Sequence, residues 1–286
     1  MNRIILITLF FIAQVSIAQN FTPYKERAQR LVQGVSFSDN DSVMYFSMPH
    51  REYLASHNIK ISGDTPRLAL YRANAEENTW TEPVLLSISG EYKDYEPTIS
   101  PTGKLLFFNS DRPVNGKQVS KNNIWYVEKE GDKWSSPKFM VHLSEVKEEQ
   151  SYPTISNDGK LIYSREVVEN GKSNYYLFET HFEGENTKKG KQILFPNFHL
   201  NSSDPCLSPN GDYLIFTGFE IDQWNETCDL YISYALDEGW STPSLLDDLN
   251  SAGPDFSPTI SSDEKRIYYR KNYNMIKAPL KRKHKH

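Results

Sequence analysis

The chain of 286 residues carries 38% hydrophobic and 24% charged residues, which suffices for a folded core and excludes a disordered or fibrous chain. Its formal net charge of −5 argues against a dedicated nucleic-acid binder. Its two cysteines exclude a disulfide scaffold and a four-thiolate zinc site. The 13% share of aromatic residues, with 17 Tyr against 5 Met, favours strands over helices and predicts an all-β fold.

Residues 1–18 have the pattern of a secretory signal peptide. Arg3 supplies the positive charge, residues 4–13 form an apolar run that only Thr8 interrupts, and Ser16 and Ala18 are the small residues of a cleavage site. The run is shorter than the ~20 residues that span a bilayer. We therefore expect an exported chain, periplasmic or secreted, with no membrane span. A buried N-terminal strand is the alternative reading of this segment.

A sequence motif recurs five times along the rest of the chain. Clear copies cover residues 96–108, 152–163, 204–216 and 257–269, and a degraded copy covers residues 35–46. The serines at the same position of each copy, spaced by 62, 56, 52 and 53 residues, are Ser38, Ser100, Ser156, Ser208 and Ser261. Each copy reads as a strand, a turn rich in Asp, Asn and Gly, and a second strand of β-branched and aromatic residues.

A third strand is expected after each hairpin, and a fourth after the first four of them. The third strands are predicted at residues 68–72, 124–127, 175–178, 230–233 and 275–278. The fourth are predicted at 84–86, 139–141, 192–194 and 245–246, all but the third of these after a Trp-x-x-Pro sequence. Four strands per unit of 50 to 60 residues is typical of a β-propeller blade. The last unit ends after three strands, so we predict a five-bladed β-propeller of four-stranded antiparallel blades, closed by an N-terminal strand at residues 28–32.

The repeat resembles the WD40-like repeats of TolB-type propellers, in the version found in exported Bacteroidetes proteins. The sequence Asn109-Ser110-Asp111-Arg112-Pro113 and the Trp-Ser-x-Pro segments strengthen this resemblance. It covers residues 28–280 and implies a periplasmic or secreted location with protein or envelope contacts. We therefore divide the chain into a signal peptide (1–18), a single propeller domain (19–280) and a basic tail (281–286), with no second domain.

The residues just before each first strand are expected to converge on one mouth of the central channel. Those singled out are Asp94, Glu96, Tyr152, Asp204 and Asp255. The long loops at 50–66, 113–122 and 218–228 should lie on the same face, and they add Trp224. Four carboxylates there could hold calcium or a basic group of a partner. Alternatively, they cap strand ends.

The sequence favours a non-catalytic module that binds a protein or a glycan and acts as a monomer. No catalytic motif accompanies the repeat, so we expect no enzyme activity, no cofactor and no nucleic-acid partner. The alternative is a carbohydrate-active hydrolase that uses two of the mouth carboxylates as acid and base. Cys206 occupies a position held by Ser or Thr in the other copies, and Cys228 begins a third strand two strand spacings away, so a disulfide between them is not expected.

Overall fold

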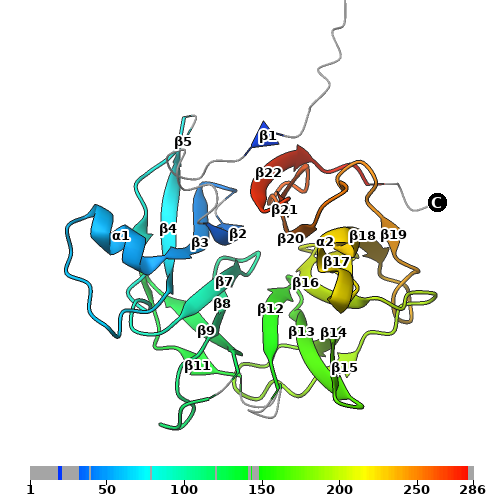
Figure 1. The fold of residues 1–286 in the computed structure, drawn as a ribbon, viewed down its shortest axis with the longest axis horizontal. Helices are drawn as coiled ribbons and strands as arrows, with labels where there is room; N and C mark the ends of the chain where they lie inside the picture. The colour runs from blue at the N-terminus through cyan, green and yellow to red at the C-terminus, as the bar shows by residue number, and fades with distance from the viewer. Residues whose placement is uncertain are drawn as a thin grey trace, which may run out of the picture.

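The computed structural model describes residues 19–20, 32–38, 40–77, 79–119, 121–140, 143 and 148–282. Five small antiparallel sheets stand around a central axis as the blades of a β-propeller (Figure 1), which confirms the predicted fold class. No helix within the described ranges is long and apolar enough to cross a membrane. The predicted signal peptide and residues 283–286 lie outside these ranges.

Each blade runs outward from the axis through three long strands in chain order. The first, innermost strands are β2 (Gln33–Ser38), β7 (Asp94–Ile99), β12 (Gln150–Ile155), β16 (Asn201–Leu207) and β20 (Asp255–Ile260). The second strands are β3 (Val43–Pro49), β8 (Leu105–Ser110), β13 (Lys160–Glu169), β17 (Tyr213–Phe219) and β21 (Arg266–Lys271). The third strands are β4 (Leu68–Glu76), β9 (Asn123–Glu130), β14 (Lys172–His181), β18 (Asp229–Tyr234) and β22 (Asn274–Pro279). Among the described residues the helices are short, namely α1 (His50–Ser56), η2 (Ile221–Gln223) and α2 (Trp224–Thr227).

The fourth strands are short, and the Trp-x-x-Pro sequence divides two of them. In the first two blades β5 (Thr79–Trp80) and β6 (Val84–Leu85) both pair with β4, and β10 (Lys133–Trp134) and β11 (Lys138–Phe139) both pair with β9. Because proline has no backbone N–H, the ladder is interrupted where it occurs. In the third and fourth blades the outer strands are β15 (Lys191–Gln192) and β19 (Ser244–Leu245).

An N-terminal strand closes the fifth blade, but it is not the predicted one. The strand β1 (Gln19–Asn20) pairs with β22 opposite Lys277 and Ile276. Of residues 28–32, which we predicted for this role, only Val32 is described, and it lies outside the strands. The edge of β22 that the prediction assigned to them is occupied by β1.

The hydrophobic cores lie between neighbouring blades. The second and third strands of adjacent sheets contribute alternate side chains to each core, as Ile215 of β17 and Ile267 of β21 do in one of them. The largest fully buried side chains include one tyrosine from each blade, namely Tyr71, Tyr126, Tyr163, Tyr213 and Tyr269. Much of the aromatic surplus of the sequence is therefore packing.

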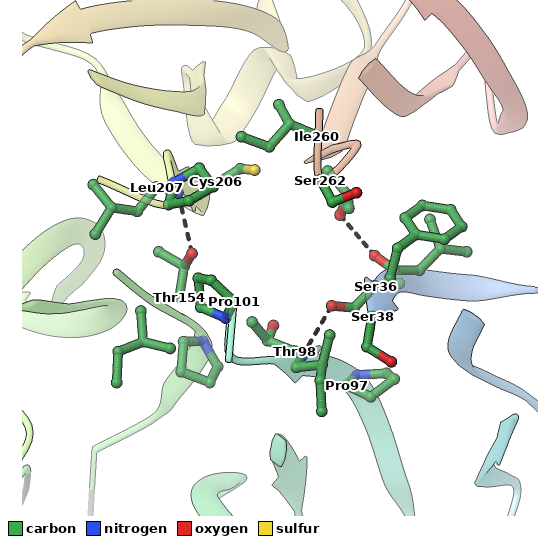
Figure 2. A pocket seen from close by; sticks show the side chains of 18 of the residues that line it. Ser36, Ser38, Pro97, Thr98, Pro101, Thr154, Cys206, Leu207, Ile260 and Ser262 are labelled. Carbon is green, nitrogen blue, oxygen red and sulfur yellow. Dashed lines mark hydrogen bonds between the residues drawn. The ribbon is translucent and has the colours of Figure 1, made fainter. Parts of the chain in front are cut away.

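Hydroxyl groups of the innermost strands tie the blades together around the axis. The Ser36 hydroxyl accepts a hydrogen bond of 2.9 Å from the Ile99 amide, and the Thr154 hydroxyl accepts one of 3.1 Å from the Leu207 amide. Across the junction of first and last blades, Thr259 donates to the carbonyl of Val35 at 2.7 Å. These groups line a cavity of about 400 Å³, which we call the lower cavity. Figure 2 shows Ser36 and Thr154 on its wall.

Both cysteines are free and buried. Cys206 lines the lower cavity in the position that a hydroxyl residue holds in the other blades (Figure 2). Burial raises the pKa of its thiol to about 12, and burial likewise raises the pKa of the Cys228 thiol.

We predict that neither thiol reacts with a disulfide reagent in the folded chain. Only the thiolate is nucleophilic, and burial disfavours it at both positions. Titration with Ellman's reagent at pH 8 should release two equivalents in denaturant and fewer than 0.2 without it, by our estimate of about a tenth of the groups reacting through local opening. Rapid release from the native protein would contradict this arrangement.

Candidate functional site

Every innermost strand contains a bulge at the same position. The ladder between the first and second strands shifts register there in all five blades. The residue at the bulge has φ between 48° and 54° in each case, and the five residues are Gly34, Glu96, Tyr152, Asp204 and Ser257. Four of them are not glycine, although such a left-handed backbone costs an L-residue roughly 1–2 kcal/mol. Bulges re-aim side chains, and they recur next to functional sites.

The five bulge residues form a ring across the channel, which we call the bulge ring. Four of its members, all except Gly34, line both the lower cavity and a second cavity of about 650 Å³. We call the second one the mouth cavity. Its walls are Gln33, Glu96, Tyr152, Asp204, Trp224, Phe256, Ser257, Arg270, Asn272 and Tyr273. The bulge ring is therefore the boundary between the two cavities.

Gly34 is required by its neighbour Glu96. A Cβ atom at position 34 would lie 2.0 Å from Glu96 Oε2, so the Glu96 side chain rests against this glycine. The Glu96 amide donates to the Ser47 hydroxyl of the first blade at 3.3 Å, which holds the bulge in place. The degraded first copy of the repeat thus makes room for a carboxyl group on the axis.

Glu96 and Asp204 are the carboxyl groups that reach the mouth cavity. Burial, reinforced by the charge of Asp204, raises the pKa of Glu96 to about 8, although Arg270 acts in the opposite direction. Burial also raises the pKa of Asp204, opposed by the Ser203 and Ser257 hydroxyls that donate to it at 2.5 and 2.8 Å. Burial and these two acids raise the pKa of Tyr152 as well.

Two of the six predicted site residues lie elsewhere. Asp94 and Asp255 are fully buried at the start of their strands and do not line the mouth cavity. The Asp94 carboxylate accepts hydrogen bonds from Ser89, Ser110 and Arg112, at 2.6 to 3.2 Å. The Asp255 carboxylate accepts from the amide and hydroxyl of Ser251. Both acids cap the loop that leads into their blade, so four carboxylates do not meet at the mouth.

A metal site has less support than the sequence suggested. Among the described residues, no three His, Cys, Asp or Glu side chains are grouped so as to hold a metal ion. The two acids of the bulge ring remain as oxygen donors, and calcium prefers six to eight. Calcium binding at the mouth stays an untested prediction.

An aromatic corner forms one wall of the mouth cavity. It consists of Trp224 on α2, Phe256 before the fifth bulge and Tyr273 in the β21–β22 turn. The ring centroids of Trp224 and Phe256 are 5.7 Å apart, and those of Phe256 and Tyr273 are 5.6 Å apart. The Tyr273 hydroxyl donates to Asn225 of α2 at 3.0 Å. Tyr273 is 51% exposed and has a φ of 64°, which is an unusual conformation for a bulky residue.

The long loops contribute unequally to this face. The loop at 218–228 brings Trp224 to the mouth cavity, as predicted. The loop at 50–66 contains α1, which lies far from the axis in Figure 1. Its Tyr53 packs on Tyr71, with ring centroids 4.7 Å apart, and lines neither cavity.

Arg270 is a wall residue that the sequence reasoning missed. Four second strands carry a small polar residue at the equivalent position, namely Ser47, Asn109, Ser164 and Thr217. The fifth carries Arg270, whose guanidinium donates to the carbonyl oxygens of Tyr273, at 2.8 Å, and of Val32. The departure from the repeat was visible in the sequence and could have identified this residue. Tyr273 gave no such signal, because turn residues vary between blades.

Several solved structures share this architecture. A TolB-type protein from Agrobacterium tumefaciens matches with a TM-score of 0.52 and 14% identity, over 84% of this chain and 69% of that one. The α-L-arabinofuranosidase of Podospora anserina, in complex with cellotriose, matches with 0.52 and 11% identity, over 90% and 93%. An endo-arabinase from Bacteroides thetaiotaomicron matches with 0.52 and 12% identity, over 87% and 93%.

These comparisons establish the fold. The resemblance to TolB-type propellers is confirmed at that level, and the same propeller serves glycoside hydrolases. No protein-family model and no curated protein sequence matches the chain. Function must therefore be argued from the site.

We predict that Asp94→Ala destabilises the fold by about 3–5 kcal/mol, because it leaves the buried Arg112 guanidinium without its counter-charge. Urea unfolding at pH 7 measures the change, and Asp132→Ala, in an exposed turn, is the matched control with an effect of about 0.5 kcal/mol or less. An Asp94→Ala variant as stable as the control would show that the ion pair contributes nothing.

We predict that Glu96→Gln is more stable than the wild type at pH 8. A carboxyl whose pKa is about 8 in the folded chain and about 4.5 when unfolded binds its proton more tightly when folded. Its contribution to stability therefore falls between these pH values, by up to about 1.4 kcal/mol per pH unit. Unfolding midpoints at pH 5, 6.5 and 8 should diverge in favour of Glu96→Gln, whereas the exposed Glu226→Gln should follow the wild type. Parallel curves for Glu96→Gln and wild type would refute the raised pKa.

Proposed function

We propose that this chain is an exported, non-catalytic binding module of the cell envelope that holds a protein or glycan ligand in its mouth cavity. The observation that carries the proposal is the bulge ring, which directs Glu96, Tyr152 and Asp204 to one cavity beside the aromatic corner. Export rests on the signal peptide predicted at residues 1–18.

Backbone strain supports a binding role for this face. At this left-handed position three blades carry Glu96, Tyr152 and Asp204 rather than glycine, and strained conformations of this kind gather at functional sites. Tyr273 adds an exposed aromatic ring at the second position of the two-residue turn between β21 and β22. Aromatic rings and a few oriented polar groups are the usual composition of a ligand pocket.

A hydrolase is the second candidate, and Glu96 is the observation that favours it. With a pKa of about 8, its carboxyl is protonated at neutral pH, as a general acid must be. The arabinofuranosidase and the endo-arabinase give the same fold an enzymatic precedent. The second carboxyl fits this role poorly, because burial raises the pKa of Asp204 and two serine hydroxyls already occupy its oxygens.

A hydrolase would cleave its ligand, whereas a binding module would not. A panel of arabinan and glucan oligosaccharides and of short peptides therefore distinguishes the two candidates. We expect the wild type to bind at least one member in calorimetry and to release no reducing sugar or new peptide end. Trp224→Ala should weaken that binding about tenfold or more, because an aromatic contact of this kind contributes about 0.5–1.5 kcal/mol beyond the area it buries.

The matched control is Glu226→Gln, which changes an exposed residue of α2 that does not line the cavity. Turnover by the wild type that disappears in Asp204→Asn would establish the hydrolase instead. Binding that Trp224→Ala leaves intact would place the ligand away from the mouth cavity.

A further inference from the structure

Glu96 is the acid of the mouth cavity to which no described residue donates a hydrogen bond. The Asp204 carboxylate accepts from two serine hydroxyls. Among the described residues, by contrast, no hydrogen bond or ion pair to the Glu96 carboxylate is formed, and the bond at this residue comes from its amide. Arg270 is the cation whose charge acts on Glu96, but its guanidinium donates to two backbone carbonyls instead. A carboxyl group so placed offers its oxygens to a ligand.

The aromatic corner has the wrong shape for a flat ligand and suits a compact one. The Trp224 and Phe256 rings are inclined at 64°, and those of Phe256 and Tyr273 at 72°. These edge-to-face contacts leave ring faces of different orientations at the corner, rather than the single flat face on which a sugar ring stacks. Aromatic faces attract cations, and cages of such rings recognise substituted ammonium groups.

The charges around the mouth cavity also favour a positively charged ligand. Four titratable groups influence Glu96 or are influenced by it: Asp204 of β16, Arg270 of β21, Tyr152 of β12 and Tyr95 of β7. The effects of burial and of Asp204 on Glu96 exceed that of Arg270, so the pKa of Glu96 is raised rather than lowered. A positive charge beside Glu96 would relieve the repulsion that Asp204 exerts on it.

We propose that the mouth cavity binds a compact organic cation, an ammonium or guanidinium group, between the Glu96 carboxylate and the aromatic corner of Trp224, Phe256 and Tyr273. This inference rests on the proposed binding function and names the chemistry of its ligand. Two sources can supply such a group, a basic side chain of a peptide and a free small amine.

Binding of a cation is linked to the protonation of Glu96. The cation pairs with the ionised carboxylate, and the free group has a pKa of about 8. Affinity should therefore rise by up to about tenfold per pH unit below pH 8 and level off above it. Each binding event below pH 8 releases up to one proton to the buffer.

Calorimetry with three probes at pH 6, 7, 8 and 9 tests the inference: methylguanidinium, the capped tripeptide Gly-Arg-Gly, and the same tripeptide with neutral citrulline in place of arginine. We expect the arginine peptide to bind at least tenfold more tightly than the citrulline peptide, with the stated pH dependence. Glu96→Gln should remove both the preference and the pH dependence, and Glu226→Gln should retain both. A peptide that binds more tightly than methylguanidinium identifies a protein source, and equal binding identifies a free amine.

Equal affinity for arginine and citrulline, or a preference that survives in Glu96→Gln, would overturn the cation site. A neutral oligosaccharide that binds with sensitivity to Trp224→Ala, while no cation binds, would overturn this inference and leave the proposed binding function standing. No binding by any probe or oligosaccharide would remove both. The thermal unfolding curve of Glu96→Gln shows that the variant is folded in each case.

Discussion

The repeated bulge in the innermost strands is the constraint on which the site depends. A regular strand alternates its side chains between the two faces of its blade. The packed cores between the blades occupy those faces. The bulge breaks this alternation once per blade and directs one side chain to the axis. Proline follows the bulge residue in four blades, where the register shift removes the need for its missing N–H. The scaffold thereby keeps its packing regular while the residue on the axis varies.

Much of the fold could be predicted from the sequence, because the same strand–turn–strand motif occurs five times. The Ser-x-Asp/Asn-Gly turns and the Trp-x-x-Pro segments placed the blades, and the third strands lie where they were expected. The closing strand was assigned to residues 28–32 because apolar residues there resemble a strand. The observed partner of β22, Gln19–Asn20, has no such pattern, since a two-residue edge strand needs only backbone pairing.

The sequence predicted only part of the candidate site, and the reason is physical. The sequence analysis selected every acid near the start of a first strand. Two positions that are only two residues apart there can point in opposite directions, one into the protein and one to the channel. Asp94 and Asp255 precede the bulge and turn into the protein, where Arg112 and Ser251 respectively donate hydrogen bonds to them. Glu96 and Asp204 occupy the bulge and face the channel. The backbone conformation at the bulge decides which acid faces the channel. A sequence pattern interpreted as a regular alternating strand does not predict that conformation.

Arg270 lies both at the junction between the first and last blades and in the wall of the mouth cavity. Its guanidinium holds the carbonyl of Val32, which is 238 residues earlier in the chain, and its other donor fixes the turn that carries Tyr273. The first and last blades cannot separate there without dismantling the cavity wall. A ligand that binds only the closed ring therefore acts as a clasp, and at a hundred times its dissociation constant it adds about 2.7 kcal/mol to the stability of the closed state. Occupancy of the site therefore also raises the resistance of the ring to unfolding and to proteolysis.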